Sequence, residues 1–164
     1  MRKLPEAHAI ALLPHLNAAM AEGGIDTPRR RAAFLAQLAH ESGELRYFEE
    51  LASGKAYEGR RDLGNVQPGD GVRYKGRGPI QITGRANYRA AGAALDIDLE
   101  NNPNRAAEPE VGFRTAVWFW TSHHLNKYAD EGNLDAITYR INGGYNGKSS
   151  RDAYYQQALK LLSR

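Results

Sequence analysis

TPRRRAAFLAQLAHESG, residues 27–43, is the stretch on which the fold depends. Its apolar residues recur at intervals of three and four, which predicts a helix that is largely buried. Thr27 followed by Pro28 is typical of a helix start, with the threonine as N-cap and the proline in the first turn. Glu41 stands at the C-terminal end of this helix, where the serine and glycine that follow indicate a break.

Further helices are expected on both sides of this element, and the sequence predicts a mainly α-helical fold with little β structure. These helices are expected at residues 5–21, 45–51, 85–94, 111–124 and 134–141, with a last one capped by Ser149 or Ser150 and running through residue 162. The apolar run in 111–124 makes it the expected core helix. Residues 52–79 hold many glycines and predict a long loop, which is usually functional or disordered in a compact domain. Ile80 and Ile82 suit a short extended segment.

The length of 164 residues suits one domain, 1–164, with a real hydrophobic core. The chain has no cysteine, which excludes disulfides and thiolate metal sites. No apolar run is long enough to span a bilayer. Polar residues such as Glu6 and His8 interrupt the N-terminal apolar residues, so no signal peptide is expected.

The net charge of +3 and the pI of about 9.2 give a mild positive bias, which favours a polyanionic partner: nucleic acid, an anionic membrane face or an acidic cell-wall polymer. Most basic residues are scattered, so an ordinary solvated surface explains them equally well. Paired carboxylates beside a polar loop argue against nucleic acid, because they would repel phosphate.

Two acidic sites nine residues apart, Glu41 and Glu50, suggest acid–base chemistry on a sugar. On one unbroken helix they would point about 180° apart and lie about 13 Å apart along the axis. A chain reversal after Ser42 would let both face one cleft, at the roughly 6.5–9.5 Å expected of an inverting glycosidase. Glu49 and Glu58 are equally good candidates for the second carboxylate on spacing alone.

Other polar residues have both a functional and a structural interpretation. The hydroxyl of Thr83 could hold a water molecule or cap a helix. Asn87 and Tyr88 could bind a sugar or could cap and pack a helix, and Asn142, next to glycine, is as typical of a turn as of a sugar ligand. The histidines lack metal-binding spacing, so no metal is expected.

Four segments resemble glycoside hydrolase family 19, the chitinase-like family, and in particular its phage-type endolysins. They are FLAQLAHES at 34–42, FEE at 48–50, YKGRGPIQITGRANY at 74–88 and INGGYNG at 141–147. The segments keep the family's order. The chain has no cysteine and its loops are short, and both features are more typical of a compact endolysin than of the plant chitinases.

The resemblance implies a two-lobed, lysozyme-like fold with a central cleft and an inverting mechanism that needs no metal or other cofactor. It implies that Glu41 is the general acid, that Glu50 is the general base and that Thr83 orients the attacking water. The residues expected to bind substrate are His40, Tyr74, Gln81, Asn87, Tyr88 and Asn142.

The resulting functional hypothesis is a monomeric endolysin that cleaves the glycan strands of peptidoglycan between N-acetylmuramic acid and N-acetylglucosamine. It is expected to stay in the cytoplasm of a host bacterium until it is released to the wall. Chitin is the alternative substrate. A hypothesis of a different class is a non-catalytic protein that binds the wall or nucleic acid through its basic surface.

Overall fold

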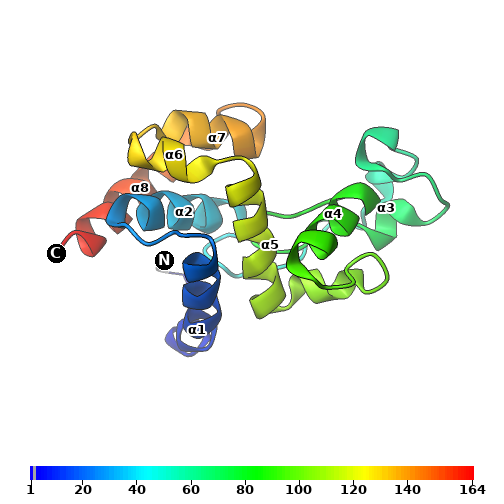
Figure 1. Cartoon of the computed structure of the whole chain (residues 1–164), viewed down its shortest axis with the longest axis horizontal. Coiled ribbons are helices and arrows are strands. Elements are labelled where there is room, and N and C mark those ends of the chain that lie inside the picture. Colours follow the sequence, from blue (N-terminus) through cyan, green and yellow to red (C-terminus); the bar gives the residue numbers. More distant parts are fainter. Residues whose placement is uncertain (2) are drawn as a thin grey trace.

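The computed structural model describes residue 1 and residues 3–164, and this part of the chain is mainly helical, as predicted (Figure 1). The α-helices are α1 (Glu6–Glu22), α2 (Pro28–Glu41), α3 (Asp70–Arg73), α4 (Arg85–Leu95), α5 (Pro109–Ser122), α6 (Leu125–Asp130), α7 (Leu134–Asn142) and α8 (Lys148–Leu162). Short 3-10 helices are η1 (Lys55–Tyr57), η2 (Arg61–Leu63) and η3 (Pro103–Ala107). Among the described residues, β pairing is limited to isolated bridges, Glu49 with Arg77 and Arg77 with Ile82.

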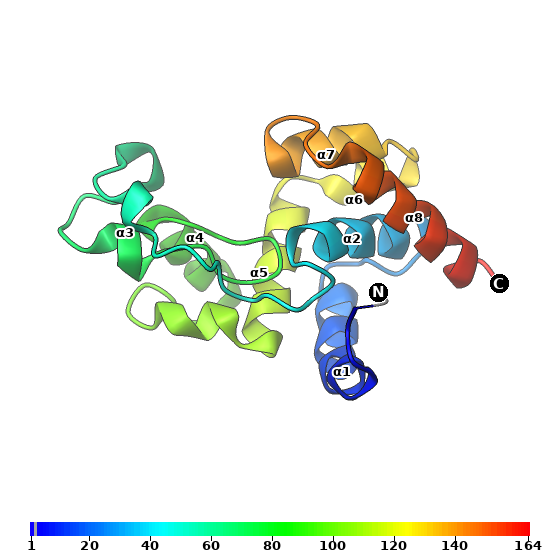
Figure 2. The ribbon, with the colours of Figure 1, turned by 180° about the vertical axis from the view of Figure 1, so that it is seen from behind.

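Two separate hydrophobic clusters give the molecule two lobes. The large-lobe cluster takes its residues mainly from α1, α2, α5, α6, α7 and α8, while the small-lobe cluster is built around α4 and the segments that flank it. Helix α5 serves both clusters, because Val111 lies in the small-lobe cluster and Phe113 and Trp120 lie in the large one. Figures 1 and 2 accordingly show α5 between the two groups of helices.

Helix α2 is the centre of the large lobe and packs along α8. Its start is the one predicted: the side chain of Thr27 accepts a hydrogen bond from Arg30 N, and Pro28 occupies the first turn. The ring of Phe34 meets that of Trp120 edge to face, with centroids 5.2 Å apart. This packing explains why both rings are fully buried.

The chain reverses direction immediately after α2, also as predicted. Gly43, Glu44 and Leu45 all have positive φ angles, and Glu44 N donates to Ala39 O. Glycine at the first of these positions is what a left-handed helix cap favours. The prediction of a helix at 45–51 is therefore wrong, because this segment begins in a left-handed turn and then forms the bridge from Glu49 to Arg77.

Two further boundaries differ from expectation. The last helix is capped by Gly147, whose φ is +70°, and not by Ser149 or Ser150. The expected helix at 111–124 ends at Ser122, and a separate helix, α6, begins at Leu125 after a left-handed His124. A left-handed residue interrupts the helical hydrogen bonds, so one continuous helix cannot form there.

The long loop 52–79 is held by polar contacts and contains η1, η2 and α3. Asn65 is fully buried and bridges two segments, since its Nδ2 donates to Tyr57 O and its Oδ1 accepts from Arg85 N. Arg85 in turn donates to both carboxylate oxygens of Asp70. These contacts fix the loop to the start of α4.

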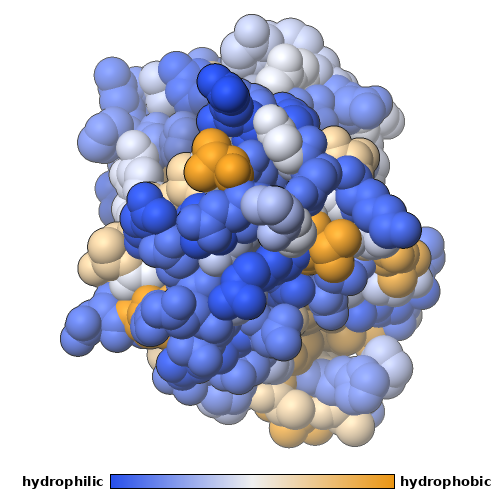
Figure 3. All heavy atoms as spheres, turned by 90° about the vertical axis from the view of Figure 1, so that its right-hand side faces the viewer, coloured by the Kyte–Doolittle hydropathy of each residue, from blue (hydrophilic) through white to orange (hydrophobic). Residues whose placement is uncertain are grey.

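The face of the molecule on the small-lobe side is mostly hydrophilic, with hydrophobic residues in separate small patches (Figure 3). Within the described residues, none of the helices has both the length and the apolar character needed to cross a membrane.

Candidate active site

Glu41 is held at the C-terminal end of α2 by a buried arginine from α8. Arg151 Nη2 donates to Glu41 Oε1 at 2.5 Å, and the Glu41 side chain remains 25% exposed. The same guanidinium donates to Gln37 Oε1, and its Nε donates to Asn146 O at 3.1 Å. Arg151 thus orients Glu41, and its other hydrogen bonds in the described residues go to the uncharged oxygens of Gln37 and Asn146.

This arrangement extends into a polar network inside the large lobe. Gln37 lies one helical turn before Glu41, and its Nε2 donates to Thr138 Oγ1 of α7 at 3.1 Å. Gln37, Thr138 and Arg151 are all buried. A buried charge is tolerated only when its hydrogen bonds are satisfied, so this network is expected to be rigid.

His40 precedes Glu41 and packs against the start of α8. Its Nδ1 lies 3.1 Å from Ser150 Oγ, and a β-carbon added to Gly147 would lie 2.1 Å from His40 Cε1. Only glycine fits at that position. Burial, reinforced by the positive charge of Arg151 and opposed by Glu41, holds the pKa of His40 below its usual value.

Glu50 belongs to the small lobe. Its backbone N donates to Gly76 O at 2.9 Å, and its Oε2 accepts from the hydroxyl of Tyr57 at 2.9 Å. Its Oε1 is buried and has no hydrogen-bond partner among the described residues. Burial and this hydrogen bond to Glu50 raise the pKa of Tyr57. A buried carboxylate oxygen without a partner is unfavourable for stability alone, which is typical of a functional group.

The two rival carboxylates have other partners. Glu49 Oε1 lies 3.0 Å from Lys75 Nζ and 3.3 Å from Arg77 Nε. The hydrogen bond from Lys75 is the main reason that the pKa of Glu49 is lowered. Glu58 uses both carboxylate oxygens to accept from backbone N–H groups, those of Gly69 and Gly71, each at 2.8 Å. Both rivals thus hold the small lobe together.

The carboxylates of Glu41 and Glu50 come from different lobes. Glu41 ends α2 and is bound by α8, whereas Glu50 is bound by the small-lobe segments around Tyr57 and Gly76. The chain between them turns back after α2 and runs across to the small lobe (Figure 2). The arrangement therefore supplies one carboxylate from each lobe.

Three more of the predicted residues form one cluster at the start of α4. Thr83 Oγ1 donates to Gln81 O at 3.2 Å, and Asn87 Nδ2 donates to Thr83 O at 2.8 Å. The Gln81 side chain also lies beside Gly76, where a β-carbon would be 3.0 Å from Gln81 Oε1 and 2.8 Å from Glu50 Oε2. Gln81 therefore adjoins the carboxylate of Glu50. Gln81 and Thr83 are half-buried and Asn87 is exposed, so all three have some contact with solvent.

Tyr74 and Tyr88 were expected to line the sugar cleft, and this prediction is wrong for their rings. Both side chains are fully buried, with ring centroids 5.3 Å apart. Their hydroxyls are used internally, because Tyr74 donates to Glu100 O and Tyr88 donates to Lys75 O. Burial raises the pKa of Tyr88 to about 12. A large ring with a satisfied hydroxyl is stable in a core, and here it builds the small lobe.

Asn142 is exposed at the end of α7, and its Oδ1 accepts from Asn146 N at 3.1 Å. Asn142 therefore has the structural role in a turn that its glycine neighbour indicated, because it holds the 143–147 loop. Its amide nitrogen has no hydrogen-bond partner in the described part of the chain.

The sequence did not single out Gln37, Tyr57 or Arg151 for the site. Gln37 carried a signal, because it is a polar residue on the apolar face of a helix, four positions before Glu41. Arg151 carried none, since it is 110 residues away from Glu41 and lies in a segment with ordinary charge content.

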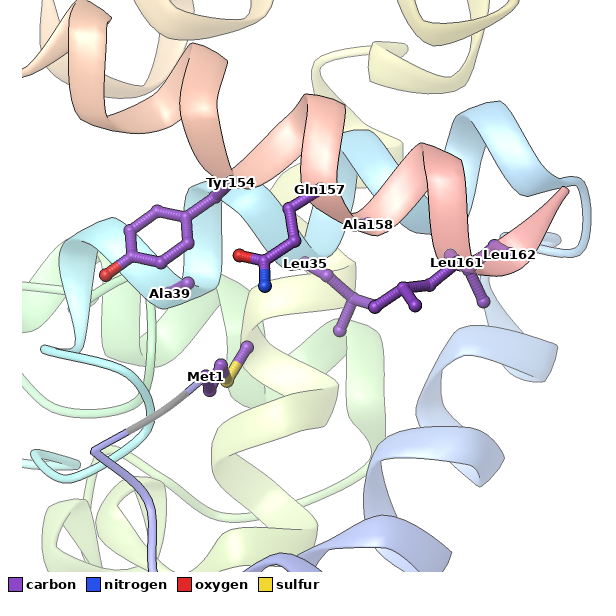
Figure 4. A pocket seen from close by; sticks show the side chains of 8 residues that line it. All are labelled: Met1, Leu35, Ala39, Tyr154, Gln157, Ala158, Leu161 and Leu162. Carbon is purple, nitrogen blue, oxygen red and sulfur yellow. The ribbon is translucent and has the colours of Figure 1, made fainter.

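A pocket lies on the large lobe, between α2 and α8 (Figure 4). It has a volume of about 210 Å³ and is lined by Met1, Leu35, Ala39, Tyr154, Gln157, Ala158, Leu161 and Leu162. None of these lining residues is among the predicted catalytic or substrate-binding residues. Within residues 1 and 3–164, no three histidine, aspartate or glutamate side chains are grouped so that they could hold a metal ion.

The sequence model of the family described as chitinase class I matches residues 9–153. The chain belongs to glycoside hydrolase family 19. A family 19 domain-containing protein of Haemophilus influenzae is 31% identical over 88% of this chain and 86% of its own length. An endochitinase of Arabidopsis thaliana is 41% identical over 85% of this chain but only 50% of its own length. The chain thus spans about half the length of that plant relative.

Solved structures of chitinases have the same fold. Chitinase C from Streptomyces griseus superposes with a TM-score of 0.76 at 28% identity, covering 92% of this chain and 83% of its own. The class IV chitinase from Zea mays gives a TM-score of 0.73 at 29% identity, covering 98% and 82%. The predicted lysozyme-like helical fold is therefore confirmed.

Proposed function

We propose that this family 19 chain hydrolyses the glycan strands of bacterial peptidoglycan by general acid–base catalysis with inversion. The observation that carries the proposal is the pair of carboxylates from opposite lobes. Glu41 is oriented by Arg151, and Glu50 has a buried oxygen that accepts no hydrogen bond from the described residues. Glu49 and Glu58 are engaged in structural contacts, which supports Glu50 as the second group.

In the proposed reaction the glycosidic C–O bond breaks while a water oxygen attacks the anomeric carbon from the opposite face. Glu41 gives its proton to the leaving sugar oxygen. Arg151 contacts Oε1, so Oε2 is the oxygen that would carry this proton. Glu50 takes a proton from the attacking water, and the hydroxyl of Thr83 helps to orient that water.

The mild positive net charge supports peptidoglycan, because its peptide stems carry carboxylates and chitin does not. Chitin is a second candidate substrate, and the names of the relatives in Arabidopsis and Streptomyces favour it. Activity on peptidoglycan would cause lysis once the protein reaches the wall. We expect the protein to remain in the bacterial cytoplasm until then, which cell fractionation before and after lysis would test.

The decisive experiment measures new reducing ends from purified sacculi and from chitin, and identifies the new chain ends by mass spectrometry. Glu41→Gln and Glu50→Gln should each abolish release, whereas Glu49→Gln is the matched control and should keep most of it. Unchanged release by Glu41→Gln would overturn the assignment of the acid. No release from either polymer by the parent protein, with binding that weakens steeply in salt, would favour the non-catalytic binding protein.

A further inference from the structure

Two exposed tyrosines next to the site belong to neither hydrophobic cluster and have no part in the proposed chemistry. Tyr139 lies on α7 and Tyr145 in the 143–147 loop, and their ring centroids are 5.7 Å apart at an interplanar angle of 45°. Tyr139 is 51% exposed and Tyr145 is 57% exposed. By contrast Tyr74, Tyr88 and Tyr155 are buried. The pair therefore places two adjoining aromatic rings at the surface.

The loop that carries Tyr145 is fastened to the residues around Glu41. Asn146 O accepts from Arg151 Nε, the same side chain that holds Glu41. Gly147 packs directly against the ring of His40. Tyr145 is two residues from Gly147, so their Cα atoms are at most about 7.6 Å apart. The aromatic pair is therefore adjacent to the large-lobe side of the site.

The pair is held in place by local hydrogen bonds. Gly143 has a φ of +78°, and its N donates to Tyr139 O at 2.7 Å. Asn142 Oδ1 accepts from Asn146 N, and Lys148 N donates to Tyr145 O at 3.2 Å. A loop fixed in this way loses little entropy when a ligand binds its side chains.

The surroundings favour a sugar over a nucleic acid as the ligand. Lys148 is paired with Asp135 and Asp152, and Arg140 lies over the ring of Tyr128 and donates to its hydroxyl. The cations beside the pair are thus already engaged, whereas stacking of nucleic-acid bases needs free cations along the strand. A sugar ring fits better, because its apolar C–H face can pack on an aromatic ring while its hydroxyl groups stay in water.

We propose that Tyr139 and Tyr145 form a sugar-stacking platform, which binds the glycan strand beyond the Glu41 side of the site. The inference rests on the proposed function only in taking the glycan as the ligand. Binding of an extended strand can be measured without hydrolysis, so the two proposals can fail separately.

The test measures binding of the full chain carrying Glu41→Gln, which keeps the polymer intact, to insoluble peptidoglycan and to chitin by co-sedimentation. Combining Tyr139→Ala and Tyr145→Ala should raise the dissociation constant about tenfold on the polymer that the Glu41→Gln protein binds. Tyr145→Phe should bind like the parent, because it keeps the aromatic face. Ile10→Ala is the control, since Ile10 is 65% exposed on α1, outside this region.

Parent-like binding by the double variant would overturn the platform, and so would an equal loss in Ile10→Ala. Absence of binding to both polymers in the Glu41→Gln parent would overturn it too. Failure of the active protein to release reducing ends would instead count against the hydrolase, while the binding comparison would still decide the role of the two tyrosines.

Discussion

Gly147→Ala should disturb the site without touching a predicted catalytic residue. The backbone of Gly147 is left-handed, with a φ of +70°, and an L-residue there costs about 1–2 kcal/mol. The new β-carbon would lie 2.1 Å from His40 Cε1 and 2.3 Å from Nε2. His40 and α8 must therefore move apart by about 1 Å, and overpacking of this kind adds about 1–3 kcal/mol.

The expected result is a loss of about 2–5 kcal/mol in the free energy of unfolding. For a chain of this length, that corresponds to a Tm lower by roughly 4–20 °C. Because His40 adjoins Glu41 and Asn146 adjoins Gly147, the shift should also move Glu41 and Arg151. A misplacement of about 1 Å can reduce kcat/KM about 100-fold. Thermal unfolding and the release of reducing ends measure the two effects separately.

The chain offers a matched control for the backbone term. Gly143 also has a positive φ, +78°, but a β-carbon there would meet nothing within 4 Å. Gly143→Ala should therefore show the backbone cost alone. His40→Ala should restore part of the stability lost in Gly147→Ala, because it removes the ring that clashes. Equal Tm values for the two glycine variants, or no recovery with His40→Ala, would refute the reasoning.

Three further predictions concern carboxylates and the groups that bind them. Arg151→Met should lower the free energy of unfolding by about 3 kcal/mol and reduce kcat, because Glu41 loses the cation that binds it. Turnover equal to that of the parent protein would contradict this prediction. Glu58→Gln should lower the free energy of unfolding by about 1–3 kcal/mol, because an amide has only one oxygen to accept the two backbone hydrogen bonds. Its kcat should stay near that of the parent protein. Loss of turnover in a folded Glu58→Gln variant would make Glu58 a catalytic candidate again. The pKa of Glu100 is lowered to about 2, chiefly by the hydrogen bond from Arg89, so its stabilising effect is present above about pH 4.5 and is lost as the pH falls toward 2. The Tm difference between the parent and Glu100→Gln should therefore shrink over that range, and a constant difference would argue against the shift.

Local features were predictable because neighbouring residues determine them. The start of α2 at Thr27 and Pro28, its end at Glu41 and the reversal after Ser42 depend on hydrogen bonds within a few residues. The start of α7 at Leu134 is of the same kind, because the side chain of Asn133 accepts a hydrogen bond from Ala136 N. The helix expected at 45–51 failed because a partner distant in sequence, Arg77, pairs with that segment.

The sequence by itself determined a helical chain with a buried helix that presents Glu41 at its end, together with a short list of acidic candidates for a second group. Only the tertiary structure distinguished those candidates by their contacts, because Glu49 and Glu58 are bound to partners in the small lobe, while one oxygen of Glu50 has no hydrogen-bond partner among the described residues. Only the tertiary structure, likewise, placed Tyr88 in the core and Arg151 beside Glu41. The physical reason is that helix periodicity and caps act over a few residues, whereas burial and ion pairing depend on which distant segments pack together.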